Sequence, residues 1–397
     1  MPKTREYKVG ALCAGYGGLE LGIREVLKTK LEWFSEIDPS ATKVMKAQFP
    51  EAKPYGDLEL LTKDIPPKVD IVTAGFPCQP VSVAAEISKD REGNNSYRKG
   101  IEDKRWLINN VCLIARKCEA NFLILENVPG LLSWKQQAAW EKVYQALYRN
   151  NFRRLEWGMY RASDVAAPHQ RRRWFCIATN TPREKLDLRK TYPIPPDFHL
   201  KGKYPYFGYR SYIGPKRRED ILIPSPPKGP KTLPTPTARE HKDSGPNVRF
   251  KRISDKSGLT GVIMHRLCKP EKGEKFKGWE SWRKHNKKKE GGDYRECIEK
   301  WEDVMNREAP NPLRDGKYGL LSPEFVEWMM GLPEEHVTGK DIGLPPGTAL
   351  RILGNGVVPQ QAAYAVASLA NRMNGRVCTA DESSHHIDQI KEMKSPK

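Results

Sequence analysis

The chain has 397 residues, which is enough for two or three domains. Its 68 Lys and Arg exceed its 49 Asp and Glu, and the formal net charge of +19 predicts a polyanionic partner, with nucleic acid the obvious one. Eight cysteines without a Cys-x-x-Cys pair argue against a disulfide framework or a zinc ribbon, so we expect a protein without metal. The absence of a long apolar run or signal peptide argues against a membrane protein, so we expect a cytoplasmic chain.

The amino-terminal residues predict a strand, a glycine-rich turn and a helix. Val9 to Cys13 is a short apolar run typical of a buried strand, and Leu19 to Lys28 has the apolar spacing of a helix. Glycines in the turn between them, Ala14-Gly15-Tyr16-Gly17-Gly18, let the backbone approach a ligand beside a helix N-terminus. The turn lacks the full dinucleotide fingerprint, so a plain tight turn is an equal alternative.

Two acidic positions follow. Trp33 to Ile37 predicts a second strand, and Glu36 lies 36 − 18 = 18 residues after Gly18, close to the ~20 at which an acid reaches ribose hydroxyls in doubly wound folds. Asp38 is a rival for that role. Asp57, after Gly56, offers a carboxylate for the adenine edge of such a nucleotide-like ligand.

A cysteine and a glutamate follow two further predicted strands. Val69 to Ala74 is β-branched and apolar, and Gly75-Phe76-Pro77-Cys78-Gln79-Pro80 comes directly after it. Ligands of open α/β sheets bind at the carboxyl ends of strands, although a buried core cysteine is the ordinary alternative. Phe122 to Leu125 predicts another buried strand, and Glu126 at its end is costly to bury without a partner or substrate.

Three adjacent arginines lie in the segment from Gln170 to Ile177. If this segment is extended, its period of two places Arg171 and Arg173 on one face. A solvated run of charge is the alternative. The segment after Thr181 is rich in proline and aromatic residues, and from Lys269 to Glu290 nine Lys or Arg face four Glu, which favours phosphate contacts.

Regular structure returns at the carboxyl end. Ser322 as N-cap and Pro323 at the first position predict a helix that ends near Gly331. The motif Gly354-Asn355-Gly356-Val357-Val358-Pro359 precedes a predicted amphipathic helix from Gln360 to about Met373.

Taken together, Pro77-Cys78-Gln79, Glu126-Asn127-Val128, the arginine strand and the last motif resemble the DNA cytosine-5 methyltransferase family of bacterial or phage type. The resemblance covers about 1–180 and 321–373. Two departures are His169, where the family usually has Gln, and Leu12-Cys13-Ala14-Gly15 in the first motif.

The resemblance implies a doubly wound, Rossmann-like α/β fold that binds S-adenosylmethionine. It implies a catalytic domain at 1–180, a target recognition domain at 181–320, a return of the catalytic domain at 321–375 and a tail at 376–397. The implied partner is double-stranded DNA, and we expect a monomer.

The resemblance also implies roles for individual residues. Cys78 adds to carbon 6 of a flipped-out cytosine, Glu126 acts as the acid at ring nitrogen 3, Arg173 binds the carbonyl at position 2, and Arg171 orients Glu126 or the thiolate. Glu36 binds the cofactor's ribose, Asp57 the adenine amino group, and Ile37 packs on the adenine ring. The remaining cofactor residues are Leu12, Gly15, Tyr16, Gly17, Gly18, Pro77 and Asn355.

Other readings of the same residues remain open. The same chemistry on tRNA is the first alternative, although the large middle region favours DNA. A non-catalytic DNA-binding protein on this scaffold, or a redox protein with Cys78 as a peroxidatic thiol, is the second. Glu126 and the arginine segment argue against both forms of the second alternative.

Overall fold

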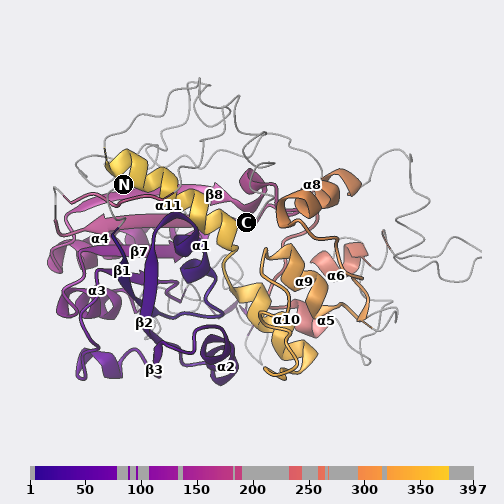
Figure 1. Ribbon diagram of the computed structural model, residues 1–397, viewed down its shortest axis with the longest axis horizontal. Coiled ribbons are helices and arrows are strands. Elements are labelled where there is room, and N and C mark those ends of the chain that lie inside the picture. Colours follow the sequence, from indigo (N-terminus) through magenta and orange to yellow (C-terminus); the bar gives the residue numbers. More distant parts are fainter. Residues whose placement is uncertain are drawn as a thin grey trace, which may run out of the picture.

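The computed structural model describes residues 5–77, 88–89, 95–96, 107–132, 137–181, 184–189, 232–243, 258–263, 267, 294–314 and 320–374. Within them, a seven-stranded sheet forms the central layer and helices cover both of its faces (Figure 1). Cys78 and the basic run from Lys269 to Glu290 lie outside the described residues.

The sheet has the strand order β3-β2-β1-β4-β7-β9-β8. The first five strands in this order pair in parallel, and β9 is antiparallel to both of its neighbours, β7 and β8. The doubly wound α/β fold expected from the sequence is therefore confirmed. The strands are β1 (Tyr7–Leu12), β2 (Thr29–Ser35), β3 (Lys53–Tyr55), β4 (Ile71–Ala74), β7 (Phe122–Asn127), β8 (Arg154–Arg161) and β9 (Arg172–Thr179), with β5 (Ser88–Lys89) and β6 (Asn95–Ser96) paired separately.

Alternating side chains of the strands build a core on each face of the sheet, because successive residues of a strand point to opposite sides. Val9, Ile71 and Ile124 belong to the core under α1 (Gly18–Val26) and α11 (Pro359–Met373). Leu12, Val72 and Leu123 belong to the core under α3 (Ile108–Lys117) and α4 (Gln137–Arg149). The helix α2 (Pro39–Gln48) follows β2 and packs Met45 with Phe34 in a smaller core.

A second lobe lies beside the sheet (Figure 1). It contains α5 (Glu240–Asp243), α6 (Gly258–Val262), α8 (Arg295–Met305), α9 (Pro323–Met329) and α10 (Pro346–Asn355). Leu259, Trp301, Trp328 and Leu353 share its buried core, so described parts of the predicted recognition domain and of the return segment pack together.

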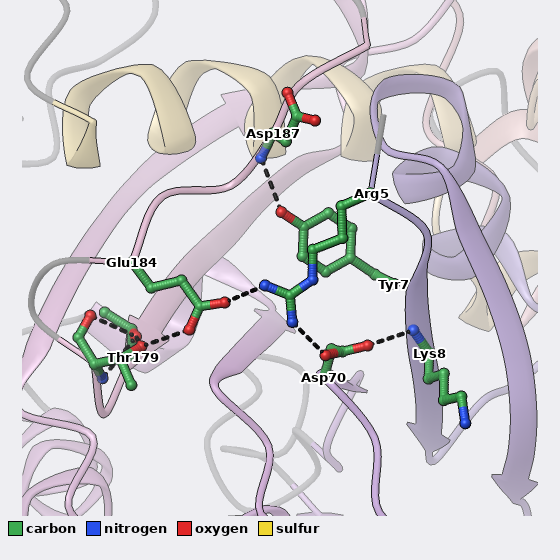
Figure 2. A network of polar contacts seen from close by, with 8 residues as sticks. Arg5, Tyr7, Lys8, Asp70, Thr179, Glu184 and Asp187 are labelled. Carbon is green, nitrogen blue, oxygen red and sulfur yellow. Dashed lines mark hydrogen bonds and ion pairs between the residues drawn. The ribbon is translucent and has the colours of Figure 1, made fainter. Parts of the chain in front are cut away.

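The segment 184–189 packs against the amino ends of β1 and β4 through polar contacts (Figure 2). Arg5 donates to Asp70 at 2.6 Å and to Glu184 at 2.5 Å, while Asp70 also accepts from the backbone N–H of Lys8. The backbone N–H of Asp187 donates to the Tyr7 hydroxyl. These contacts join the chain that leaves β9 to the edge of the sheet opposite the predicted site.

The predicted elements at the ends of the chain are confirmed with small shifts. Ser322 caps α9 by accepting from the backbone N–H of Phe325, and α11 begins at Pro359. The predicted arginine strand is wrong at its start, because β9 begins at Arg172 and Arg171 has a φ of 26°, which is not extended backbone. Sequence reasoning missed β3, β8, α2, α4 and α10.

Glu20 in α1 is a buried carboxyl that bears on stability. It accepts from the Thr73 hydroxyl at 2.6 Å, and the described residues give it no ion-pair partner. Burial raises the pKa of Glu20 from an ordinary 4.5 to about 7. The folded state therefore binds this proton more tightly than the unfolded state does.

We predict that Glu20→Gln removes a pH dependence of stability. In the wild type, the contribution of Glu20 is fully present below the unfolded pKa near 4.5 and is lost as pH rises through the folded pKa of about 7. The loss amounts to about 3 kcal/mol of unfolding free energy. Urea unfolding at pH 5 and pH 8 measures it; equal pH dependence in Glu20→Gln and wild type would contradict the assignment.

Candidate active site

The candidate site lies at the sheet edge where the carboxyl ends of β1, β2, β4 and β7 meet, since these strands run parallel. The glycine-rich turn follows β1, Glu36 follows β2, and Gly75-Phe76-Pro77 follows β4. Glu126 is the last residue but one of β7. The fold thus brings together residues from four separate stretches that the sequence predicted to share a site.

Two glycines of the turn adopt left-handed backbone conformations, Gly15 with φ 57° and Gly17 with φ 82°. A Cβ on Gly17 would lie 2.5 Å from the Phe49 ring, so this glycine is also required by packing. A Cβ on Gly15 would meet no atom within 4 Å, and the same holds for Gly56 at the end of β3. Open space therefore borders both glycines.

The carboxylate of Glu36 organises the turn. Its two oxygens accept from the backbone N–H of Gly15 at 2.8 Å and from that of Asp38 at 2.9 Å. Both Glu36 and Asp57 help raise the pKa of the Cys13 thiol to about 12, after burial, which is the larger cause. Both carboxylates therefore lie near the Cys13 thiol, which comes just before the turn.

Asp38, the alternative to Glu36 as the ribose ligand, already forms structural contacts through both of its carboxylate oxygens. One of its oxygens caps α2 by accepting from the backbone N–H groups of Ser40 and Ala41, and the other pairs with Arg351 at 2.6 Å. Both carboxylates accept backbone N–H groups, but among the described ion pairs only Asp38 has a cationic partner, and this favours Glu36 as the ligand-binding carboxylate.

The exposed side chain of Ile37 completes this half of the site. It is 73% exposed, so its apolar surface is open to a ligand. An apolar surface beside two carboxylates and two open glycines fits a ligand with an aromatic base and a ribose. The residues present therefore fit S-adenosylmethionine.

Leu12 and Tyr16 differ from the other predicted cofactor residues, because each side chain is only 1% exposed. Leu12 lies in the core under α3 and α4, and Tyr16 lies in the core of the second lobe. The Tyr16 hydroxyl donates to the carbonyl of Val357 at 2.8 Å. These two side chains support the turn from the protein interior, while Asn355 at the end of α10 is exposed.

Glu126 and Arg173 form the charged centre of the other half. Glu126 Oε1 lies 2.9 Å from Arg173 Nε, and Glu126 is only 8% exposed. Burial raises the pKa of Glu126, although Arg173 and Arg171 oppose the rise. The second carboxylate oxygen lies 3.6 Å from the Cβ position of Gly75, so this acid borders the turn that leads to Cys78.

Arg171 is held by backbone carbonyls from two distant segments. Its guanidinium donates to the carbonyls of Pro236 at 3.0 Å and Gly354 at 3.1 Å, and also to that of Gly356. The charge of Arg171 also acts on Glu126 and opposes the rise of its pKa. The role predicted for Arg171, orienting Glu126 or the thiolate, stays a prediction. Its positive φ places Arg171 outside the extended backbone of β9, so the period of two that predicted a shared face for Arg171 and Arg173 does not apply at Arg171.

Asn127 is a residue whose role sequence reasoning missed. Its side-chain amide donates to the carbonyl of Phe76 at 3.1 Å, and its oxygen accepts from the backbone N–H of Val128. Phe76 lies two residues before Cys78, so Asn127 fixes the direction of that turn. A polar residue at the end of a buried strand was the available signal.

Over the described ranges, no group of three or more His, Cys, Asp or Glu side chains could hold a metal ion. Among the helices of those ranges, none is long and apolar enough to cross a membrane. Cys13, Cys112, Cys118 and Cys176, in the same ranges, carry free thiols, and the Cys297 thiol donates to the Tyr294 carbonyl.

Comparison with known proteins identifies the family. The family model described as C-5 cytosine-specific DNA methylase matches residues 7–371, so the chain belongs to that family. The resemblance seen in the sequence motifs is thereby confirmed.

Individual relatives match over part of the chain. The Type II methyltransferase M1.ScrFI of Lactococcus lactis subsp. cremoris is 29% identical over 176 residues, 44% of this chain and 42% of that protein. The Type II methyltransferase M.CviJI of Paramecium bursaria Chlorella virus IL3A is 32% identical over 180 residues, 45% and 44% of the two chains. The chain thus spans less than half the length of these curated relatives.

Solved structures match over more of the chain but at low identity. The Entamoeba histolytica methyltransferase EhMeth is 14% identical with a TM-score of 0.47, covering 93% of this chain and 99% of its own. The S. pombe Dnmt2 methyltransferase is 16% identical with a TM-score of 0.46, covering 93% and 99%.

We predict that Glu36→Gln weakens S-adenosylmethionine binding by roughly 10–100-fold, because it removes a charged acceptor of hydrogen bonds. Asp38→Asn is the matched control, since Asn retains the cap of α2. Its dissociation constant should stay within about threefold of wild type. Calorimetry measures both; a larger loss in Asp38→Asn would make Asp38 the ribose ligand.

Proposed function

We propose that the protein is a site-specific DNA methyltransferase, which transfers a methyl group from S-adenosylmethionine to carbon 5 of a flipped-out cytosine in duplex DNA. The family membership supports the reaction, and the relatives named as Type II methyltransferases support site specificity. The net charge of +19 supports a nucleic-acid substrate.

The observation that carries this proposal is the buried Glu126–Arg173 pair beside the turn that leads to Cys78. Cytosine carbon 5 is a poor nucleophile, and addition of the Cys78 thiolate to carbon 6 would make it enamine-like. Negative charge then develops on the ring. An acid at ring nitrogen 3 and a cation at the position 2 oxygen would disperse that charge.

Glu126 and Arg173 suit these two tasks. Burial favours the neutral form of Glu126, which can donate a proton or a hydrogen bond to ring nitrogen 3. Arg173 contacts Glu126 through Nε and the Arg172 carbonyl through one terminal nitrogen. The guanidinium is therefore held in a fixed direction, from which it can bind the carbonyl oxygen of the base.

The remaining steps of the reaction use Cys78 and the cofactor. S-adenosylmethionine supplies an electrophilic methyl group bound to a sulfonium. When carbon 5 takes the methyl group, the sulfonium becomes a neutral thioether. Carbon 5 then gives its hydrogen as a proton to a general base, the electrons of that bond form the carbon 5–carbon 6 double bond, and the bond between carbon 6 and sulfur breaks to release the Cys78 thiolate. Since a duplex hides these atoms, the base must leave the stack, as it does for methyltransferases generally.

The proposed domain roles follow the same reasoning. Residues 1–180 and 321–375 would carry the reaction, and 181–320 would choose the DNA sequence, while 376–397 form a tail. The described residues 232–240 are anchored to the catalytic strand, since Thr235 accepts from the backbone N–H of Arg171 and Leu233 bridges His169. The monomeric state and the cytoplasmic location stay predictions.

Expression in a methylation-free bacterium, followed by bisulfite sequencing of its genome, tests the proposed function. We expect one short motif methylated throughout the genome with the wild type and none with Cys78→Ala. Methylated tRNA without methylated DNA would move the proposal to the tRNA alternative. No methylation of either nucleic acid by a folded protein would overturn it.

We predict that Glu126→Gln lowers methyl transfer by roughly 10²–10⁴-fold, because it keeps the shape but removes the acid. Since burial raises the pKa of Glu126, wild-type turnover should fall as pH rises through that pKa, and the residual turnover of Glu126→Gln should lack this decline. Initial rates across pH measure both effects.

Glu119→Gln is the matched control for this substitution. Glu119 forms an exposed ion pair with Lys68, so the variant should keep wild-type rates and the wild-type pH profile. Glu126→Gln with wild-type turnover would contradict the role of the acid.

A further inference from the structure

The glycine-rich turn is held from the second lobe as well as from the sheet. Tyr16 lies between two glycines with left-handed backbone conformations, and its buried ring belongs to the core of the second lobe. A Cβ on Gly356 would lie 1.8 Å from the Tyr16 ring, which shows how closely the return segment packs on it. A side chain of the predicted cofactor turn is thus embedded in a different lobe.

His336 holds the backbone of the same residue. Its Nε2 lies 2.7 Å from the carbonyl oxygen of Tyr16, and the two rings meet edge to face with centroids 6.1 Å apart. Because a carbonyl only accepts, the Nε2–H of His336 donates to it. Burial lowers the pKa of His336, which favours the neutral ring. The glycine neighbours of the Tyr16–Gly17 peptide allow it several orientations. Its N–H donates to the Ala14 carbonyl within the turn at 2.9 Å, and its carbonyl is held from the second lobe by His336.

Glu327 in α9 holds the loop that carries His336. Its buried carboxylate accepts from the backbone N–H groups of Glu335, Val337 and Thr338, and from the Thr338 hydroxyl at 2.8 Å. Charged acceptors with several donors are among the stronger hydrogen-bonded groups. The Gln48 side chain also donates to the His336 carbonyl at 3.0 Å, which joins this loop to α2.

We propose that His336, fixed by Glu327, is a positioning residue that keeps the glycine-rich turn in the conformation that binds S-adenosylmethionine. The proposal rests on the cofactor assigned under the proposed function. It connects the lobe that carries part of the predicted recognition domain to the cofactor site, through Glu327, His336 and Tyr16.

Four variants test this connection. His336→Leu removes the donor to Tyr16, whereas His336→Gln keeps an N–H donor at a similar reach. Thr338→Val is a milder change that removes one bond to Glu327. Trp301→Phe is the matched control, because it removes a buried hydrogen bond to the Trp328 carbonyl in the same lobe without touching the turn.

Two readouts apply to each variant. Calorimetry gives the dissociation constant of S-adenosylmethionine, and amide hydrogen exchange of residues 14–18 without ligand gives the local stability of the turn. We expect His336→Leu to raise the dissociation constant about 5–30-fold and to speed exchange in the turn. Thr338→Val should shift both readouts in the same direction by less, and His336→Gln should return the dissociation constant to within about threefold of wild type.

The outcomes separate this inference from the proposed function. A wild-type constant and wild-type exchange in folded His336→Leu or Thr338→Val would overturn the inference, as would an equal rise in Trp301→Phe. Failure of the wild type to bind S-adenosylmethionine would overturn the proposed cofactor and the claim that His336 prepares the turn to bind it. Faster exchange of residues 14–18 in His336→Leu would still show that His336 holds the turn.

Discussion

Arg171 lies where three distant stretches of the chain meet, and the relative placement of the two lobes depends on it. The residue is only 2% exposed, and its guanidinium donates to carbonyls of Pro236, Gly354 and Gly356. A buried charge of this kind is stable only where several acceptors surround it. Its backbone has a positive φ and is held on both sides, since its N–H donates to Thr235 and its carbonyl accepts from Gln361. The start of β9, the segment 232–240 and the return segment therefore keep one arrangement.

This arrangement places the catalytic candidates and the cofactor turn side by side. Arg173 follows Arg171 by two residues and reaches Glu126 across the β7–β9 pair, while Asn127 holds the turn before Cys78. The return segment that Arg171 binds also holds the glycine-rich turn, because the Val357 carbonyl accepts a hydrogen bond from the Tyr16 hydroxyl. Neighbouring carbonyls of the return segment thus serve both halves of the site, Gly354 and Gly356 for Arg171 and Val357 for Tyr16. A change that loosens the return segment should affect cofactor binding and the acid together.

Sequence reasoning reached the fold class and the location of the site, because strand-end residues follow short apolar runs that are easy to recognise. Glu36 and Glu126 could be placed in this way, and the capped helix α9 carried clear terminal signals. The backbone conformation of Arg171 could not be predicted, since it is held by contacts with Thr235 and Gln361, which lie far away in the chain. His336 was also missed: a single histidine in a loop gives no signal until the structure places it against Tyr16. The helix α10 lacks a side-chain N-cap bond, which hid it from a search for capping signals.

The central claim is that Cys78 attacks cytosine beside the Glu126–Arg173 pair. The most direct measurement uses a duplex whose target cytosine carries fluorine at carbon 5, incubated with the protein and S-adenosylmethionine and analysed by peptide mass spectrometry. Because the fluorine cannot leave as a proton does, the thiolate cannot be expelled after methyl transfer. The account predicts a stable adduct between the DNA and the peptide that contains Cys78. An adduct on another residue, or no adduct on a duplex that the protein methylates in its unfluorinated form, would contradict it.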